Sequence, residues 1–266
     1  MSIVSVSMEV ATRFSRIALD TQATVARVTL HNPPLNIIDI PMMEELAQAL
    51  TEIEANHQVT TIVISGSHKA FSVGVDVAAH TPDKVQGMLD KFHGVIRALV
   101  ASKKVSIAAV HGHCLGGGAE LALVCDLVYT SELATWGFPE IKLGCYPPVA
   151  VTALAALVGQ KHAADLVLTG RTITGKAAAK IGLANAVVPE IDLEHTVQDA
   201  VQRLAPLSPA ALAITKKAIY AWDSIHFDKG LARAEKIYFE DLMKTEDAQE
   251  GINAFLQKRT PEWKGK

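Results

Sequence analysis

The first half of the chain contains short hydrophobic runs whose pattern is typical of β-strands. Residues 13–30 hold two of them, RFSRIALD and TVARVTL, separated by the polar pair Thr21-Gln22. Residues 59–65 and 105–110 are apolar runs rich in β-branched side chains. Such length and composition favour strands, and the continuous run at 105–110 favours a buried one. We therefore expect strands in all of these segments.

Segments with helical spacing separate these runs. Asp39 can cap a helix that has Pro41 in its first turn and continues to about Asn56. Residues 82–101 place their apolar side chains near the helical period and predict a second, amphipathic helix. Between Ser65 and His80 we expect a loop that contains glycine. Alternating strands and helices are typical of a parallel sheet flanked by helices.

The second half of the chain is predicted to be mostly helical. From about Val149 onward helical patterns dominate, with one short strand expected at 186–188. Residues 209–258 favour three amphipathic helices, and no repeat or low-complexity tract interrupts them. A chain of 266 residues can form one large domain or a domain with an appendage.

Composition excludes several classes of function. With 5% aromatic residues and a net charge of −3, the chain has neither a stacking platform nor a basic surface for nucleic acid. Its three cysteines form no C-x-x-C pair, and their odd number argues against a disulfide framework. No apolar run approaches the roughly 18 residues of a membrane span, and residues 1–14 show no signal-peptide pattern. We expect a cytoplasmic protein without a membrane partner.

Candidate chemistry lies directly after the strand at 105–110. Gly116–Gly118 lead into AELALVC, a run of strong helix formers. A strand that turns through glycines into a helix exposes unpaired N–H groups, and no Cβ keeps a ligand away from them. Glu120 lies in the first predicted turn, and Glu140 follows 20 residues later in a Gly-Phe-Pro-Glu turn. The pattern suggests an oxyanion-binding backbone served by two carboxylates.

Simpler explanations for the same residues remain open at this point. A glutamate in a first helical turn often does no more than complement the helix dipole. Gly112 and Gly116–Gly118 do not fit the dinucleotide motif G-x-G-x-x-G, and the turn lacks the serine of a nucleophile elbow. The residue pattern alone therefore indicates an α/β protein with an anion or carbonyl site.

Two segments resemble a known family. HGHCLGGGAELALVCDLVYTSELATWGFPEIKLG, at 111–144, closely resembles the signature of the crotonase, or enoyl-CoA hydratase/isomerase, superfamily, and KAFSVGVDV, at 69–77, resembles its other oxyanion loop. The resemblance covers essentially the whole chain. It implies an α/β fold in which residues 1–205 form a spiral of ββα units with the acyl-CoA site. Residues 206–266 would form a helical region that packs on this core and mediates trimerisation, with trimers often pairing into hexamers.

The resemblance also assigns roles to residues. The backbone N–H groups of Val75 and Gly117 would form an oxyanion hole for a thioester, and Asp76, Val77 and Ala78 would line the CoA arm together with them. Glu120 would bind and activate water, and Glu140 would transfer a proton to the substrate carbon, although a coupled pair titrates as a unit. Branches with both carboxylates are typically hydratases. No cofactor is implied beyond the CoA of the substrate.

Two loops depart from the usual hydratase pattern. Pro147-Pro148 replace a glycine-rich stretch after Glu140, and residues 32–45, NPPLNIIDIPMMEE, replace the usual Ala-Leu-Asn-Ala loop. Both variants resemble the alicyclic dienoyl-CoA hydratase branch, which implies addition of water to cyclohexa-1,5-diene-1-carbonyl-CoA to give 6-hydroxycyclohex-1-ene-1-carbonyl-CoA. A general short-chain enoyl-CoA hydratase, an enoyl-CoA isomerase and a non-catalytic scaffold of the same fold stay open as alternatives.

Other polar residues have ordinary explanations. His111 and His113 lack a third ligand, so no metal site is expected there. His80 could touch substrate or lie in a solvated loop. Asp126 is expected to cap the turn that follows the signature helix. Lys216, on a predicted terminal helix, could meet CoA phosphates, but a solvated position is the simpler expectation.

Overall fold

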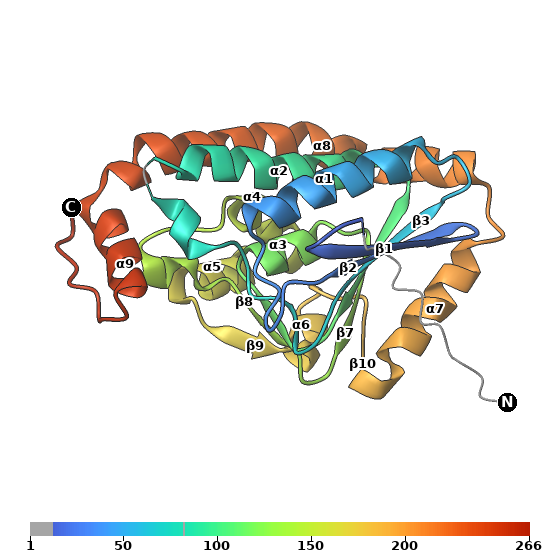
Figure 1. The fold of residues 1–266 in the computed structure, drawn as a ribbon, viewed down its shortest axis with the longest axis horizontal. Coiled ribbons are helices and arrows are strands. Elements are labelled where there is room, and N and C mark those ends of the chain that lie inside the picture. Colours follow the sequence, from blue (N-terminus) through green and yellow to red (C-terminus); the bar gives the residue numbers. More distant parts are fainter. Residues whose placement is uncertain (1–12, 82) are drawn as a thin grey trace, which may run out of the picture.

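The computed structural model describes residues 13–81 and 83–266. Residues 1–12, which hold most of the segment without a signal-peptide pattern, lie outside this range. Pro82, the expected first residue of the second helix, lies outside it as well. The described chain alternates strands and helices up to α4 and is mainly helical beyond it, as the hydrophobic pattern predicts (Figure 1).

A six-stranded sheet forms the larger layer. Its order is β1-β2-β3-β5-β7-β10, and all pairs except the β1–β2 hairpin are parallel. The strands are β1 (Ile17–Gln22), β2 (Val25–Leu30), β3 (Thr61–Gly66), β5 (Val105–Val110), β7 (Leu127–Ser131) and β10 (Ala186–Val188). Every residue of β5 is buried, as its continuous apolar run predicts.

A second sheet of four short strands has the order β4-β6-β8-β9. Its strands are β4 (Ala70–Ser72), β6 (His113–Leu115), β8 (Thr135–Gly137) and β9 (Thr172–Thr174). The sequence did not predict them, because a three-residue strand is too short to show a period of two. The expected loop at 65–80 therefore contains β4 and, at Val77–His80, a 3₁₀ turn.

The two sheets are built by successive turns of a spiral. Each turn gives one strand to the large sheet and the next to the small sheet, and then adds a helix. The turns are β3-β4-α2, β5-β6-α3 and β7-β8 followed by α4, with α2 (Val85–Ala101), α3 (Gly117–Leu123) and α4 (Pro148–Val158). The predicted α/β spiral of ββα units is confirmed.

The first helix follows its sequence signals closely. α1 (Ile40–Ala55) has Asp39 as N-cap, and the Asp39 side chain accepts a hydrogen bond from the Met42 N–H at 3.0 Å. Pro41 lies in the first turn, and Asn56 is the C-cap. The capping oxygen and the proline thus fix the start of the helix, as expected.

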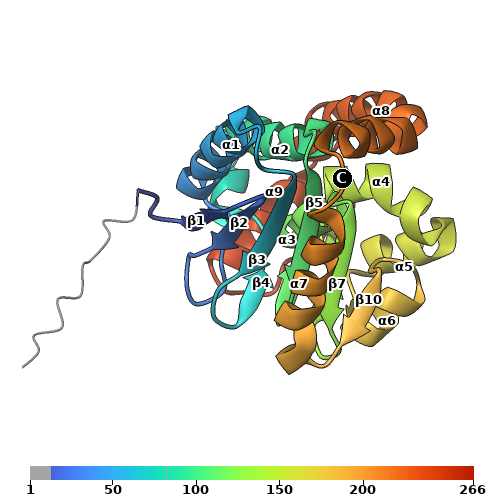
Figure 2. The same cartoon turned by 90° about the vertical axis from the view of Figure 1, so that its right-hand side faces the viewer.

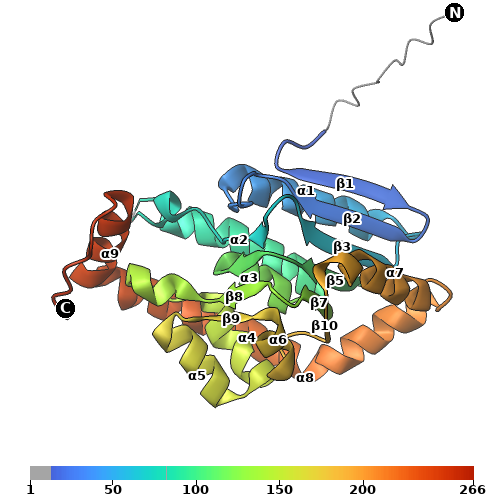
Figure 3. The ribbon, with the colours of Figure 1, turned by 90° about the horizontal axis from the view of Figure 1, so that it is seen from below.

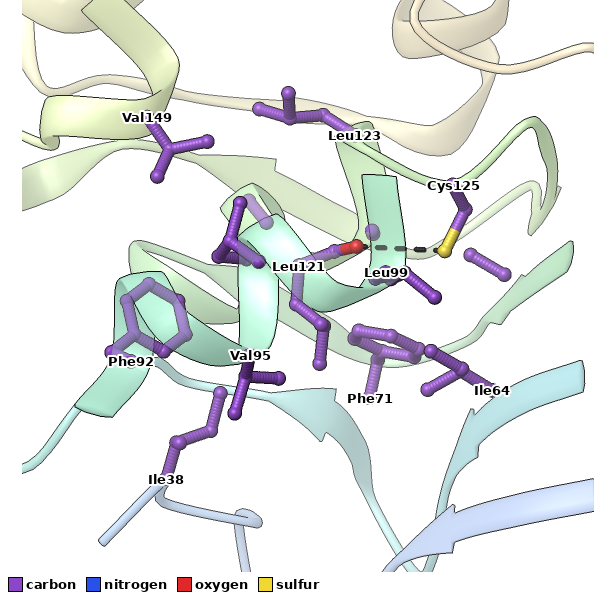
Figure 4. Packing of buried hydrophobic residues seen from close by; sticks show 14 of the residues in the cluster. Ile38, Ile64, Phe71, Phe92, Val95, Leu99, Leu121, Leu123, Cys125 and Val149 are labelled. Carbon is purple, nitrogen blue, oxygen red and sulfur yellow. Dashed lines mark hydrogen bonds between the residues drawn. The ribbon is translucent and has the colours of Figure 1, made fainter. Parts of the chain in front are cut away.

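The main core lies between the two sheets and the helices α1 to α4. Figure 4 shows Phe71 of β4, Phe92 and Leu99 of α2, and Leu121 of α3 packed together, and all are fully buried. The other face of the large sheet is covered by α7 (Leu193–Leu204) (Figure 2). α3 is thus an interior helix, and the glycine turn before it is held from several sides.

The C-terminal region differs from the prediction of three helices. It consists of α8 (Pro209–Glu240), a single helix of 32 residues, then a 3₁₀ turn at Leu242–Lys244 and α9 (Glu246–Leu256). Gly230 does not break α8 but allows close packing, since a Cβ there would lie 2.8 Å from Thr152 Cγ2 of α4. The expected boundary at 205/206 falls between α7 and α8 and remains a prediction.

Two further helices, α5 (Gln160–Thr169) and α6 (Gly175–Lys180), follow α4 in the chain and precede β10; all four elements are labelled in Figure 3. The predicted strand at 186–188 is confirmed as β10. No helix among the described residues has the length and apolar character needed to cross a membrane.

A buried ion pair joins α8 to the sheet and corrects two expectations. Lys216 is not solvated, because its side chain is 8% exposed and its Nζ lies 2.8 Å from Asp126 Oδ2. Asp126 does not cap a turn of its own, because its Oδ2 also accepts hydrogen bonds from the Ser106 N–H and hydroxyl at the start of β5. Lys216 also donates to the Lys104 carbonyl at 2.9 Å. The pair therefore fixes α8 against the end of α3.

We expect Lys216→Met to lower the free energy of unfolding by about 3 kcal/mol, because it leaves Asp126 buried without its cation. Chemical denaturation monitored by circular dichroism measures this difference. Lys217→Met is the matched control, since Lys217 is the exposed neighbour on the same helix, and it should change stability by less than about 0.5 kcal/mol. Equal effects of the two variants would contradict the assigned role of the pair.

Candidate active site

The predicted site residues follow the carboxyl ends of three neighbouring parallel strands. β4 pairs with β6 and β6 pairs with β8, all in parallel. Val75 follows β4, Gly117 follows β6, and Glu140 follows β8. Because parallel strands end at the same edge of a sheet, these residues come together although 65 positions separate the first from the last. The small sheet thus assembles the site.

Backbone pairing sets the direction of the Val75 N–H. Val75 forms a parallel bridge with Ile38, in which the Ile38 N–H donates to the Gly74 carbonyl at 2.9 Å and the Asp76 N–H donates to the Ile38 carbonyl at 3.2 Å. In such a bridge the N–H of the central residue points away from its partner. The Val75 N–H is therefore directed away from Ile38, to the side on which Gly117 lies.

The two glycine-containing turns approach each other closely. A Cβ on Gly117 would lie 2.7 Å from Val75 Cγ2 and 3.4 Å from Val75 N. A Cβ on Gly74 would lie 3.1 Å from Gly117 N, and Gly74 has a φ of +103°. Within the described residues, the Val75 and Gly117 N–H groups donate to no other backbone group. Both residues line the same cavity, so two unpaired donors border it.

Glu120 is held by the start of another helix. It lies in the first turn of α3 and is 3% exposed. Its Oε1 accepts hydrogen bonds from the Val149 N–H at 2.8 Å and the Ala150 N–H at 2.9 Å, in the first turn of α4. Burial raises the pKa of Glu120 to about 7, and the two N–H donors oppose the rise. The anion of Glu120 is thus buried but has partners.

Glu140 lacks such partners. It lies in a 3₁₀ segment, Pro139–Leu143, that follows β8. Its Oε2 is buried and has no hydrogen-bond partner within the described chain. Its Oε1 faces Gly116, where a Cβ would come within 2.6 Å. Burial, and then the negative charge of Glu120, hold the pKa of Glu140 well above its ordinary value.

The different surroundings of the two carboxyl groups decide which one carries a proton. Two buried carboxyl groups whose charges interact do not both ionise readily at neutral pH. The Glu120 anion receives two N–H donors, whereas Glu140 Oε2 receives none. Of the two, Glu140 therefore keeps a proton more readily, and Glu120 is the group whose anion the site favours.

The cavity between these groups has a volume of about 70 Å³. Val75, Val77, Gly117, Glu120 and Glu140 line it, so these predicted site residues come together. Asp76 and Ala78 do not line it. The Asp76 side chain instead accepts a hydrogen bond from the Ala78 N–H at 3.0 Å and caps the 3₁₀ turn. Contact of Asp76 and Ala78 with a CoA arm stays a prediction.

Several lining residues were not predicted from the sequence. Leu89 and Phe92 come from α2, Leu143 and Tyr146 come from the segment before α4, and Tyr238 comes from α8. No local sequence signal marks Tyr238, because its place in the site depends on how α8 docks. Pro147 and Pro148 line the cavity, so one of the two unusual loops forms part of its wall.

The other unusual loop supports the site from outside. Asn36 is fully buried, and its Nδ2 donates to the Ser67 and Ala70 carbonyls, each at 2.8 Å. The Ser72 hydroxyl donates to the Asn36 carbonyl at 2.7 Å. Asn36 thus holds the ends of β4, from which the Val75 loop departs.

His80 lines the cavity rather than lying in solvent. Its Nδ1 lies 3.1 Å from the Asp76 carbonyl oxygen, and burial lowers its pKa. The described residues contain no group of three or more His, Cys, Asp or Glu side chains that could hold a metal ion.

Comparison with known proteins identifies the family. Residues 20–266 match the enoyl-CoA hydratase/isomerase family. A probable enoyl-CoA hydratase of Rhizobium meliloti (strain 1021) is 37% identical, with 94% of this chain and 98% of the relative covered. A cyclohexa-1,5-dienecarbonyl-CoA hydratase of Thauera aromatica is 32% identical, with 94% and 97% covered. This chain belongs to the enoyl-CoA hydratase/isomerase family, as its two motifs indicated.

A solved structure shows the same fold. An enoyl-CoA hydratase from Mycobacterium avium subsp. paratuberculosis K-10 superposes with a TM-score of 0.85 at 28% identity, with 94% of this chain and 99% of the other covered. The predictions of a crotonase-type fold and of an enzyme are therefore confirmed.

Glu140→Gln should raise the melting temperature by roughly 5 °C at pH 8 and by much less at pH 5. The pKa of Glu140 is higher in the folded state than in the unfolded state. The protonated side chain therefore contributes fully to stability below the unfolded pKa, and the protein loses that stability as pH rises towards the folded pKa. Glutamine does not ionise, so the variant does not lose this stability at high pH. Differential scanning calorimetry at both pH values tests the prediction, with the exposed Glu190→Gln as control. A shift that is equal at both pH values would contradict it.

Proposed function

We propose that this protein is a hydro-lyase that adds water to an α,β-unsaturated acyl-CoA. The observation that carries the proposal is the pair of buried glutamates, one hydrogen-bonded and one unpartnered, beside two unpaired N–H donors. Among family members, the substrate named for the Thauera aromatica relative is cyclohexa-1,5-dienecarbonyl-CoA. We take this ring diene as the best candidate, with 6-hydroxycyclohex-1-ene-1-carbonyl-CoA as the product.

The two N–H donors would act on the thioester carbonyl. Attack of water on the conjugated acyl group gives the thioester enolate character, so negative charge grows on the carbonyl oxygen. Val75 N–H and Gly117 N–H would donate to that oxygen in a site from which bulk water is largely excluded. Because the folded backbone fixes these donors, little reorganisation opposes the reaction, and removal of one typically costs about two to three powers of ten in rate.

The two glutamates would divide the proton transfers. Glu120, the carboxylate, would accept a proton from the attacking water. Glu140, the carboxylic acid, would deliver its proton to the substrate carbon. The two groups exchange protonation states in each turnover and are restored when the proton returns to Glu140. Raised pKa values suit both roles, because a proton is transferred most readily between groups whose affinities are close to the working pH.

Ring preference is supported by the shape of the cavity wall. Pro147 and Pro148 line the site, and their fixed backbone angles make that wall stiff. Phe92, Tyr146 and Tyr238 add aromatic surface. A rigid, partly aromatic pocket suits a planar ring better than a mobile alkyl chain, because a ring loses little conformational entropy on binding.

A general short-chain enoyl-CoA hydratase is the second candidate. It is favoured by the higher identity, 37% against 32%, to the relative named as a probable enoyl-CoA hydratase. Comparison of kcat/KM for cyclohexa-1,5-diene-1-carbonyl-CoA and crotonyl-CoA separates the two candidates. Preference for the ring diene, with one water added, supports the first, and preference for crotonyl-CoA supports the second.

The same assay would reveal an isomerase or a scaffold without catalytic activity. An enoyl-CoA isomerase would shift a double bond without incorporating oxygen from ¹⁸O-labelled water. A non-catalytic scaffold would turn over neither substrate. Both outcomes would contradict the proposed hydro-lyase.

Each of Glu120→Gln and Glu140→Gln should lower kcat by at least about a hundredfold, because general acid–base groups contribute roughly 10²–10⁴. Steady-state kinetics with the better of the two substrates measures the loss, and Glu190→Gln is the surface control. Retention of wild-type turnover in either site variant would remove that residue from the mechanism.

Ala150→Pro should move the acidic limb of the pH–kcat profile to higher pH. The substitution removes one of the two N–H donors that favour the Glu120 anion, while the first turn of a helix tolerates proline. Ala150→Ser, which changes the same side chain but keeps the N–H, is the control. An unchanged profile in a folded Ala150→Pro variant would argue against Glu120 as the base.

We also propose a homotrimer or homohexamer, based on the family resemblance. Ile214 and Ile219 on α8 are 69% and 64% exposed in the single chain, and such residues suit an interface between copies. Light scattering of the purified protein measures the state, and a monomer would contradict the proposal.

A further inference from the structure

A second, much larger cavity lies beside the candidate site. Its volume is about 750 Å³, roughly ten times that of the cavity between the glutamates. Its walls come mainly from the end of α3, from α4 and from α8, and most of the lining is apolar. Leu123 and Cys125, labelled in Figure 4, lie on the α3 side, while Leu157 of α4 and Phe227 of α8 lie on other walls.

Tyr146 separates the two cavities. Of the described residues that line them, it is the one that both share. Tyr146 directly precedes Pro147 and Pro148, which start α4 and form part of the smaller cavity. Its neighbours on α8 divide in the same way, since Tyr238 lines the small cavity whereas Ala234 and Ile237 line the large one.

Two contacts hold the Tyr146 ring in this position. Its hydroxyl donates to the Ala234 carbonyl at 2.6 Å. Its ring meets the Tyr238 ring edge-on, with the centroids 5.3 Å apart and the planes at 77°. Tyr238 is 1% exposed and packs in the core, so it cannot easily move aside. A ring that is anchored at its hydroxyl and supported along its edge forms a firm wall.

The lining of the small cavity indicates where an acyl group would lie. By the family resemblance, the CoA arm of a thioester held at Val75 and Gly117 would pass Val77, which lines the same cavity. The acyl group would then extend to the remaining lining, where Tyr146 and Tyr238 lie. A straight chain longer than the small cavity would meet the Tyr146 ring, with the large apolar cavity behind it.

We propose that Tyr146 determines acyl-chain specificity by closing the acyl pocket and shutting the substrate out of the 750 Å³ cavity. The inference rests on the proposed function, because it concerns the acyl group of the same acyl-CoA substrate. The Tyr146 ring would restrict the enzyme to short or compact acyl groups. The proposal also implies that a single substitution opens a ready-made apolar channel for a long alkyl chain, since each methylene buried there adds favourable hydrophobic energy.

The test is the affinity of Tyr146→Ala for two saturated ligands that cannot react, butyryl-CoA and decanoyl-CoA, measured by isothermal titration calorimetry. The wild type should bind decanoyl-CoA more weakly than butyryl-CoA. In Tyr146→Ala the ratio of the decanoyl to the butyryl Kd should fall at least about tenfold, since even two newly buried methylenes account for that factor. The ratio of kcat/KM for trans-2-decenoyl-CoA over crotonyl-CoA should rise by a similar factor.

Three further variants make the test specific. Tyr146→Phe loses the hydroxyl bond but keeps the ring and its edge-on contact with Tyr238, so it should keep the wild-type ratio. Tyr146→Leu removes the ring but retains apolar bulk, and provides a second open variant if Tyr146→Ala does not fold. Ala156→Trp fills the large cavity from an exposed position on α4. It should leave the wild-type ratio unchanged and should cancel the gain when combined with Tyr146→Ala.

The proposal is overturned if the wild type binds both ligands equally well, if folded Tyr146→Ala and Tyr146→Leu both keep the wild-type ratio, or if the gain survives Ala156→Trp. Failure of the proposed function would be seen separately, as a wild type that hydrates neither crotonyl-CoA nor the ring diene. In that case the binding ratios still decide whether Tyr146 closes the pocket.

Discussion

Two carboxyl groups buried beside each other impose the main constraint on this structure. Moving a carboxylate out of water is costly, and a second one nearby adds repulsion. The fold contains no cation at this position among the lining residues it describes. It instead supplies the Val149 and Ala150 N–H groups to Glu120 and leaves Glu140 in its neutral form. The proline-led start of α4 is therefore as much a part of the site as the glutamates.

The positions of the two unpaired N–H donors depend on local backbone geometry more than on a long helix. α3 has seven residues, so its macrodipole is small. What fixes the donors is the parallel pairing of β4 with β6, the bridge between Ile38 and Val75, and the close approach that Gly74 and Gly117 allow. Asn36 holds the end of β4 from behind. The geometry of the candidate site is thus a property of the small sheet and its supports.

Much of this arrangement could be predicted from the sequence. The rest could not, because it depends on very short strands or on contacts between distant residues, and neither leaves a local pattern. Capping by Asp39, the buried run at 105–110 and the glycine turn before Glu120 are local signals, and each led to the correct element. The strands of the small sheet are too short to show a period. Tyr146, Tyr238 and the Lys216–Asp126 pair depend on the docking of α8, which is set by contacts between residues far apart in the chain. Gly230 shows the same limit, because a glycine that usually weakens a helix here permits its close packing on α4.

The place of Tyr238 near the end of the chain has a consequence for biosynthesis. Both glutamates and both donors are translated before α8, and Tyr238 follows Glu140 by 98 residues. Until α8 docks, the part of the cavity wall that Tyr238 supplies is missing. A chain that is still being synthesised therefore contains all four groups before the wall beside them is complete.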